Sequence, residues 1–561
     1  MIQRFQPQHR LLVTILVLSV CLYCDGMGWG LPSFSGWAVD EVLPSQVLRG
    51  MQAGFTNGWS EKYPPFHFYL LAILYLPVYW LNHGDFTKLT EDLEIYTTVF
   101  YLGRSLSVLM GAAIVGLIYI LAREVYSQSS ALWSALMTAV LLPMVYYAKV
   151  VNLDVPYLFW VMLSLIFYIR ILKAHLLKDY LLFAIVAAIA VATKDQAYGF
   201  YILTPFFILW RYYQFLKQHA DEQRQSPIWI HILRDPRLVY PLLAGIITFV
   251  LLNNIIFNWQ GFLRHLELIT TGSARVVPRY EQTLGGHLQM FWQSWRHIRF
   301  ASGWPLYIVC LVGLITALCK PRQHALALML WVPLISYYLT YITVIVFNDV
   351  RYLLAINLIL TIFGGQWLAQ HLVPMQIQAQ INHPIPRYRW PWRSLAISLI
   401  FIYSFFYSYS INVLMKHDSR YTVEAWMAAN IPEEASILAT GAKRYLPRLE
   451  EHYDHVDIAM EPTIAHLEQY PFEYVITTSG YDIRRFAPGS PQYEFFDQLE
   501  QGTLGYQKVF AYRSQPWPDL LNHQELGERY LEKRTIHSNF DKINPKICIY
   551  ARTQQEGLNR L

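Results

Sequence analysis

Residues 11–41 read LLVTILVLSVCLYCDGMGWGLPSFSGWAVDE and place an apolar run directly before an acidic pair. The run covers roughly residues 11–25, and the pair is Asp40 and Glu41. Some twenty residues later comes Glu61-Lys62-Tyr63-Pro64-Pro65, beside a second apolar run. Apolar runs of this kind are typical of membrane helices, so these charged side chains are expected at a membrane boundary.

The composition of the whole chain is that of a membrane protein. Of its 561 residues, 54% are apolar and only 15% are charged, and the mean hydropathy is +0.25. A soluble core of this length needs far less hydrophobic sequence, so the chain is expected to be polytopic. The net charge of +5 is small and the basic residues lie between apolar runs, which argues against nucleic acid as a partner. Five cysteines are too few for a disulfide scaffold.

Twelve apolar runs are candidates for membrane spans. They lie near residues 11–25, 66–82, 98–121, 128–147, 155–172, 179–193, 199–210, 238–257, 303–319, 325–347, 351–373 and 394–413. Lys and Arg gather in short cytoplasmic loops, and the basic loops fall on one side only if the run 66–82 does not cross. That run is short and contains Pro77, so it is expected to be juxtamembrane. About eleven transmembrane helices are therefore predicted. No Ala-x-Ala-like cleavage site follows the first run, which favours an uncleaved span over a signal peptide.

This arrangement gives four longer stretches the same, extracytoplasmic side. They are residues 26–97, 148–155, 258–302 and everything after about 414. The Lys194-Asp195-Gln196 break and the turn before Arg351 face the same way. A charge at the middle of a span costs about 2.5–3.5 kcal/mol, so these groups are expected at helix ends or along a wet cavity.

The last 145 or so residues have a different composition. Residues 436–440, 474–478, 506–512 and 546–550 are typical of strands, with more polar, helix-compatible stretches between them. We therefore expect a transmembrane domain over residues 1–413, with a first outer loop at 26–97, and a small extracytoplasmic α/β domain over 414–561. The cluster His452, Asp454, His455 and Asp457 lacks a fourth ligand of defined spacing and is expected to be solvated surface.

Several short strings occur in a characteristic order along residues 10 to 440. They are Trp37-Ala38-Val39-Asp40-Glu41, then Gly54, Lys62-Tyr63-Pro64-Pro65-Phe66, Arg104, Asn152-Leu153-Asp154-Val155-Pro156, Thr193-Lys194-Asp195, Arg351-Tyr352 and Trp426 to Pro432. Together they resemble the GT-C glycosyltransferases, specifically the glycosyltransferase family 39 group. This group contains protein O-mannosyltransferases and the bacterial enzymes that add aminoarabinose to lipid A.

The resemblance implies an enzyme that takes a sugar from a polyprenyl phosphate and passes it, with inversion, to an acceptor hydroxyl outside the cytoplasm. The implied acceptor is a lipid, a glycan or a protein. A polyprenyl chain gains about 0.8 kcal/mol per buried methylene, so the donor stays in the bilayer and the site must be interfacial. Direct displacement needs a base for the acceptor proton, and the departing phosphate needs cations rather than a strong acid.

Three carboxylates are the catalytic candidates. Asp40 matches the first acidic position of the family motif and is expected to be the base, against the alternative of an interfacial carboxylate that caps a helix or pairs with a cation. Glu41 is adjacent and cannot share the direction of Asp40, so it is expected to orient the loop or hold a cation. Asp154 matches the second acidic position and is expected to place the acceptor or a partner group, although its string also fits an ordinary turn before a helix.

The donor phosphate is expected to bind Lys194, Arg351 and Lys62. Lys194 interrupts an apolar stretch where an unpaired charge is costly, and the alternatives are an ion pair with Asp195 or snorkelling. Arg351 could instead anchor at the interface beside Asp349. Lys62 lies one position before the place that the aminoarabinose branch gives to lysine, which is Tyr63 here.

Two further arginines, Arg275 and Arg279, could close over the donor or the acceptor from the long outer loop. The role of Arg104, which also matches the family, does not follow from the sequence.

No cofactor is required by these residues. The chain has no Asp-x-Asp, which argues against a metal-bound nucleotide sugar, while Asp40, Glu41 and Asp154 could hold a divalent cation if they converge. The alternatives are a transporter, for which matching repeats are missing, and a polymer-export component, which would not need the acidic pair. No Asn-x-Ser/Thr sequon occurs, and with the C-terminal domain this favours a bacterial inner membrane and undecaprenyl phosphate.

Overall fold

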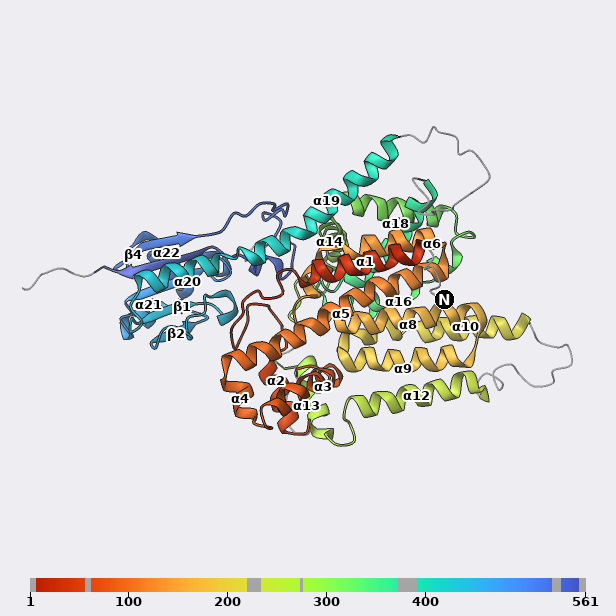
Figure 1. Ribbon diagram of the computed structural model, residues 1–561, viewed down its shortest axis with the longest axis horizontal. Helices are drawn as coiled ribbons and strands as arrows, with labels where there is room; N and C mark the ends of the chain where they lie inside the picture. Colours follow the sequence, from red (N-terminus) through yellow and green to blue (C-terminus); the bar gives the residue numbers. More distant parts are fainter. Residues whose placement is uncertain are drawn as a thin grey trace, which may run out of the picture. The chain divides into compact units, whose positions relative to one another are not determined.

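The computed structural model describes residues 7–55, 62–218, 234–272, 276–371, 391–526 and 536–553. The chain divides into two compact units (Figure 1). The membrane unit consists of residues 1–27 and 41–408, and the C-terminal unit consists of residues 28–40 and 409–561. The chain therefore passes between the units at three places, one of which is the Asp40–Glu41 peptide bond.

The membrane unit is helical throughout its described part. Its long helices are α1 (Pro7–Cys24), α5 (Leu93–Val125), α6 (Gln128–Ala139), α7 (Leu142–Tyr147), α8 (Asp154–Ala174), α9 (Leu177–Thr193), α10 (Thr204–Gln218), α12 (Pro236–Leu252), α14 (Leu284–Cys319), α18 (Leu354–His371) and α19 (Pro391–Lys416). One further helical stretch consists of α15 (Ala325–Leu328), α16 (Trp331–Tyr337), η2 (Tyr338–Ile342) and α17 (Thr343–Ile345). The shorter elements are α2 (Pro44–Gln52), α3 (Phe66–Leu81), α4 (Phe86–Glu91), η1 (Asp195–Tyr201) and α13 (Trp259–Thr270).

Five helices of the described residues are long and apolar enough to cross a membrane. They are Leu93–Val125, Asp154–Ala174, Leu284–Cys319, Ala325–Ile345 and Trp392–Asn430, and shorter apolar helices cover His9–Cys24, Phe66–Leu81 and Pro236–Leu252. The helix α3, for which the sequence favours a juxtamembrane place, has 16 residues, contains Pro77 and is about 24 Å long at 1.5 Å per residue. The protein is a polytopic membrane protein, as the sequence predicts.

Small residues let three helices of the membrane unit approach closely. A Cβ atom on Gly365 of α18 would lie 2.3 Å from Oγ of Ser134 on α6, and one on Gly313 of α14 would lie 2.3 Å from the carbonyl oxygen of Phe363. Larger side chains at these glycines would push the helices apart. This is the packing expected in a bilayer, where close backbone approach replaces the hydrophobic effect between helices.

The C-terminal unit is a small α/β domain built on one five-stranded sheet. Its strands are β1 (Ile437–Thr440), β2 (Val456–Ala459), β3 (Tyr474–Thr478), β4 (Tyr506–Tyr512) and β5 (Ile547–Arg552), in the order β2-β1-β3-β5-β4. The β1 strand pairs in parallel with β2 and β3, whereas β5 is antiparallel to β3 and β4. Its helical elements are α20 (Ser419–Asn430), η3 (Lys443–Tyr445), α21 (Ile464–Gln469), η4 (Ile483–Arg485), α22 (Pro491–Gln501) and η5 (Phe540–Lys542).

Helices cover both faces of this sheet, and each face has its own apolar cluster. Met427 of α20 packs with Ile437 and Ile549 on one face. Phe495 of α22 packs with Leu438 and Tyr550 on the other. Because neighbouring strand residues point to opposite faces, Ile437 and Leu438 belong to different clusters. The predicted α/β domain is confirmed, and the strand that the sequence analysis missed is β2.

Candidate active site

A buried ion pair joins the start of α8 to the end of α9. The two helices form an antiparallel hairpin with a two-residue turn, so their distant ends lie together (Figure 1). Asp154 is the first residue of α8, and Lys194 follows α9 with an extended backbone that ends the helix. Nζ of Lys194 donates to Oδ1 of Asp154 at 2.6 Å, with Asp154 fully buried and the Lys194 side chain 11% exposed. Lys194 thus pairs with Asp154, which is distant in sequence, rather than only with its chain neighbour Asp195.

Arg351 brings a second cation to the same carboxylate. Its Nη1 lies 3.8 Å from Oδ2 of Asp154, and its Nε lies 3.8 Å from Oδ2 of Asp349. The turn before α18 fixes this position, because the backbone N–H of Arg351 donates to Oδ1 of Asp349 at 2.9 Å. Two carboxylates and two cations therefore gather where α8, α9 and α18 end or begin. The pair of Lys194 with Asp154 is short, and the longer pairs of Arg351 add charge attraction at low exposure.

Polar and aromatic side chains complete this cluster. Nε2 of Gln196 lies 3.5 Å from Oδ1 of Asp154, and the hydroxyl of Tyr341 lies 3.5 Å from Oε1 of Gln196. Tyr157, one turn after Asp154 on α8, has its ring centroid 5.6 Å from Nζ of Lys194. The ring of Tyr157 can therefore stabilise the positive charge of Lys194 by a cation–π interaction.

Glu41 is held by Arg104, an arginine that is fully buried on α5. Nε and Nη2 of Arg104 donate to the two carboxylate oxygens of Glu41, each at 2.9 Å. Oε1 of Glu41 also accepts from the backbone N–H of Val151 at 2.8 Å, three residues before Asp154. The remaining Nη1 of Arg104 donates to the carbonyl of Met27 at 2.6 Å. With its oxygens bound in this way, Glu41 fixes the outer loop against the turn that precedes α8.

Asp40 belongs to the C-terminal unit, although its chain neighbour Glu41 belongs to the membrane unit. It is half-buried and has a left-handed backbone with φ of 57°. Lys62 is exposed, and its Nζ lies 5.1 Å from the ring centroid of Tyr63. The structure thus gathers Asp154, Lys194 and Arg351 in one cluster, while Glu41 has a separate cation as its partner.

The helix α13 contacts the residue after Lys194. Nε2 of His265 lies 2.9 Å from Oδ1 of Asp195, and the His265 side chain is 8% exposed. This contact ties the segment Trp259–Thr270 to the end of α9. Arg279 is also described, and its backbone N–H donates to the carbonyl of Val346 at 3.0 Å. Arg275 lies outside the described residues.

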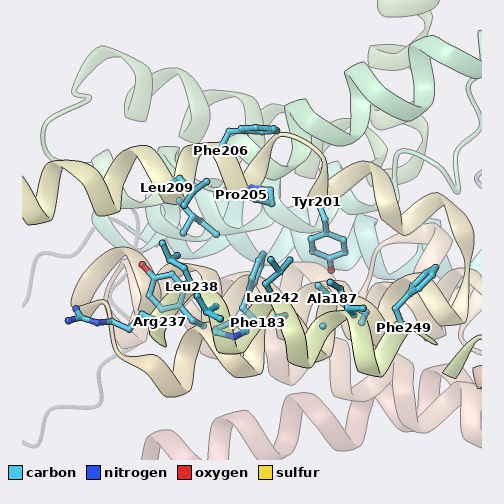
Figure 2. A pocket seen from close by; sticks show the side chains of 18 of the residues that line it. Phe183, Ala187, Tyr201, Pro205, Phe206, Leu209, Arg237, Leu238, Leu242 and Phe249 are labelled. Atoms are coloured by element: carbon cyan, nitrogen blue, oxygen red, sulfur yellow. The ribbon is translucent and has the colours of Figure 1, made fainter. Parts of the chain in front are cut away.

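An apolar groove of about 1060 Å³ runs between α9, α10 and α12. Figure 2 shows Arg237 at one end of the groove and Phe249 at the other, with Phe183 and Leu242 between them. Twelve residues of α12 separate these ends, which is about 18 Å at 1.5 Å per residue. On α9 the lining extends to Val191, three residues before Lys194. The groove is thus long enough for an extended hydrocarbon chain.

No group of three His, Cys, Asp or Glu side chains in the described ranges is arranged to hold a metal ion. Of the three carboxylates that could share a divalent cation, Glu41 already binds Arg104 and Asp154 already binds Lys194. In the C-terminal unit, Asp457 lies 2.8 Å from Nε2 of His466.

Several residues of the cluster escaped the sequence analysis. Tyr157 is three positions after Asp154, a spacing that places both on one face of a helix and could have been noticed. Gln196 and Tyr341 carry no signal of their own, because ordinary polar and aromatic residues occupy such positions in most membrane proteins. His265 could not have been paired with Asp195, since 70 residues separate them.

One family model matches the middle of the membrane unit. Residues 94–220 match the family described as dolichyl-phosphate-mannose-protein mannosyltransferase. These residues resemble a mannosyltransferase family. They include Arg104, Asp154 and Lys194, so the resemblance predicted from the motifs is confirmed over this segment. No curated protein sequence matches the chain.

Solved structures of membrane glycosyltransferases are similar to the chain at low identity. ArnT from Cupriavidus metallidurans in the apo state has a TM-score of 0.47 and 12% identity, covering 97% of this chain and 98% of its own. The apo oligosaccharyltransferase of Archaeoglobus fulgidus has a TM-score of 0.46 and 11% identity, covering 92% of this chain and 76% of its own. The S. cerevisiae protein O-mannosyltransferase Pmt1-Pmt2 complex bound to the sugar donor has a TM-score of 0.34 and 20% identity, covering 47% and 35%. With all three TM-scores below 0.5, the function rests on this chain's own residues and on the family match.

Proposed function

We propose that this protein is a membrane glycosyltransferase that moves a sugar from a polyprenyl phosphate donor to an acceptor hydroxyl on the extracytoplasmic face. One observation carries the proposal. The lining of the apolar groove between α9, α10 and α12 extends to Val191, and the buried cation Lys194 follows three positions later in the chain. A lipid phosphate complements both features, because its long apolar tail suits the groove and its anionic head suits the cation. The family match over residues 94–220 supports the same reaction class.

The proposed reaction is a direct displacement at the anomeric carbon. Asp40 takes the acceptor proton, and the acceptor oxygen forms a new bond to the anomeric carbon on the face opposite the phosphate. The bond between that carbon and the phosphate oxygen breaks, and its electron pair stays on the phosphate. The sugar is thereby transferred with inversion, and no acid is needed because the phosphate leaves as a stable anion.

Lys194 and Arg351 supply the positive charge that the departing phosphate needs. Both face Asp154, at 2.6 and 3.8 Å, so this carboxylate holds the cations in place before the donor arrives. Cations fixed in advance in a site of low exposure stabilise developing negative charge without reorganisation. Asp154 is therefore proposed to be a positioning residue for these two cations. Glu41 is proposed to position the chain around it through its ion pair with Arg104. Lys62 is exposed and stays a candidate for an incoming phosphate.

The hydrocarbon tail of the donor is proposed to lie in the groove. Its lining is almost entirely apolar, and a polyprenyl chain gains about 0.8 kcal/mol for each methylene that it buries there. The groove thereby fixes the phosphate near Lys194 and leaves the sugar at the outer ends of the helices.

The alternative of a transporter is less well supported. Asp154 begins α8, Lys194 follows α9 and Arg351 precedes α18, so the charges of the cluster lie at helix ends rather than at mid-span. An extracytoplasmic enzyme is expected to have this distribution. The inner membrane of a bacterium is the proposed location, with a lipid, a glycan or a protein as acceptor.

The test replaces the proposed base. Asn tolerates left-handed backbone as well as Asp does, so Asp40→Asn keeps the φ of 57° and removes only the proton acceptor. We expect at least a thousandfold loss of sugar transfer in purified membranes, with normal insertion and thermal stability. Glu91→Gln, an exposed acid of the same outer loop, is the control and should retain full transfer. Normal turnover by Asp40→Asn would remove Asp40 as the base. Mass spectrometry of envelope lipids and glycans, with and without the protein, would identify the donor and the acceptor.

A further inference from the structure

The outer-loop segment 28–40 is bound along its length by side chains of the C-terminal unit. Nε1 of Trp29 donates to Oδ2 of Asp418 at 2.9 Å, and the backbone N–H of Gly30 donates to the hydroxyl of Tyr421 at 3.0 Å. Further along, Nη1 of Arg448 donates to the carbonyl of Pro32 at 3.2 Å. These contacts join residues 389 to 416 positions apart, so the segment is an integral part of the C-terminal unit.

Trp37 is the best-buried anchor of this segment, with 1% of its surface exposed. Its ring centroid lies 4.1 Å from Cζ of Arg420 and 5.5 Å from Cζ of Arg448. The ring of Tyr421 lies 4.8 Å away, centroid to centroid. Two guanidinium groups at an indole ring give both cation–π attraction and a large buried contact. Gly30 allows this packing, since a Cβ there would lie 2.8 Å from the backbone nitrogen of Trp37.

The arginine beside Trp37 is itself rigidly held. Nε and Nη2 of Arg420 donate to the two carboxylate oxygens of Asp418, at 2.9 and 2.7 Å, and both side chains are fully buried. Arg444 binds the residue after Trp37, because its Nη1 donates to the carbonyl of Ala38 at 3.2 Å. The last of these anchors is two residues before Asp40.

The chain is also bound on the other side of Asp40. Glu41 is bound by Arg104, and the backbone N–H of Val42 donates to the carbonyl of Val151 at 2.8 Å. Val39 and Asp40 thus lie in the chain between Ala38, which is bound within the C-terminal unit, and Glu41, which is bound within the membrane unit. Its left-handed φ of 57° costs about 1–2 kcal/mol for a residue with a side chain, and such a conformation persists where the surroundings over-determine it.

We infer that the C-terminal unit is a positioning element for Asp40, whose backbone it fixes through Trp37, Arg420 and Arg448. The inference rests on the proposed role of Asp40 as the base. Asp40 is three positions after Trp37, so the two residues are at most about 10 Å apart along the chain. A shift of about 1 Å in a reacting group can cost a hundredfold in rate, so release of Trp37 lowers turnover without removing any group that touches the donor.

Two graded variants test this inference in the full-length protein. Trp37→Phe keeps an aromatic ring but has a smaller surface for the two guanidinium groups. Arg448→Gln removes one of these guanidinium groups, its bond to Pro32 and its ion pair with Glu424. We expect each to lower kcat at least tenfold, with the donor KM within twofold and the pH dependence of kcat unchanged. Hydrogen exchange of residues 28–40 should become faster. Arg484→Ala, which removes an exposed ion pair with Asp482 in the same unit, is the matched control and should change neither quantity.

The outcomes separate this inference from the proposed function. If the unaltered protein transfers sugar and both variants keep its kcat, the positioning role is wrong. A loss that is entirely a rise in donor KM, or one that Arg484→Ala shares, also overturns it. If the unaltered protein transfers no sugar, the proposed function fails first, and faster exchange of residues 28–40 in the variants would still report the hold of the C-terminal unit on the loop.

Discussion

Glu41 and Arg104 form a fully buried ion pair, and its energetics differ from those of a surface pair. Burying two charges is costly, and their attraction offsets that cost only when the geometry is good and the remaining polar atoms are bonded. Here both carboxylate oxygens and three guanidinium nitrogens have partners. The pair therefore fixes the path of the outer loop more than it adds to the net free energy of folding.

Removing only the arginine should be strongly destabilising. Arg104→Ala leaves the Glu41 carboxylate buried without its counter-ion, and we expect a loss of about 3–5 kcal/mol in the free energy of unfolding, measured in detergent. The double variant Glu41→Gln with Arg104→Met has no buried charge and should recover at least half of that loss. Lys443→Ala is the control, since its pair with Glu450 is half-exposed and should matter by less than about 1 kcal/mol. A small effect of Arg104→Ala would contradict the assigned burial of the pair.

The individual site residues could be found from sequence, but their pairings could not. Lys194 interrupts an apolar stretch, where an unpaired charge is costly, whereas Asp154 and Arg351 are candidates because their strings resemble the motifs of the family. Sequence proximity then suggested Asp195 as a partner of Lys194, whereas the fold supplies Asp154 across the α8–α9 hairpin. The acidic pair was even less predictable. Asp40 and Glu41 are adjacent in sequence, yet they belong to different units, and only the three-dimensional structure assigns them.

At the scale of helices, apolar runs predict where the helices lie, but they do not predict the spaces between them. Each of the eleven predicted spans is helical in the structure over most of its described length, because long apolar runs must satisfy their backbone within a membrane. The groove depends instead on side-chain size along three helices, with small residues such as Ala184, Ala187 and Gly245 forming part of its lining. A hydropathy pattern does not distinguish a small apolar residue at a groove from one at a tight helix contact.

Filling the groove should discriminate donors by their tail length. Ala187→Phe adds a large side chain to the lining of α9 (Figure 2). We expect at least a tenfold rise in KM for a long-chain polyprenyl phosphate donor and little change for a short-chain analogue. Leu243→Phe is the control, because Leu243 is exposed on α12 and does not line the groove. Equal effects on long and short donors would show that the groove does not hold the tail.

At the scale of the whole molecule, the asymmetric distribution of basic residues sets the predicted orientation. Lys320 and Arg322 lie between α14 and α15, and Arg393 lies at the start of α19. Basic side chains in short loops stay on the cytoplasmic side, so the opposite ends of these helices should face outward. The ion-pair cluster and the C-terminal unit are attached to those opposite ends. The chemistry and the positioning element are thereby predicted to share one side of the membrane.

Single cysteines would test this orientation directly in a background without the five native ones. Gln507→Cys is exposed on β4 of the C-terminal unit, and Arg322→Cys is exposed in the turn before α15. Three predicted spans separate these positions, so they should lie on opposite sides. We expect a membrane-impermeant maleimide to label Gln507→Cys in spheroplasts and to label Arg322→Cys only after permeabilisation or in inverted vesicles. The reverse pattern would place the cluster in the cytoplasm, where Asp40 could not serve an extracytoplasmic acceptor. Equal labelling of both positions in sealed spheroplasts would mean that the number of spans between them is even.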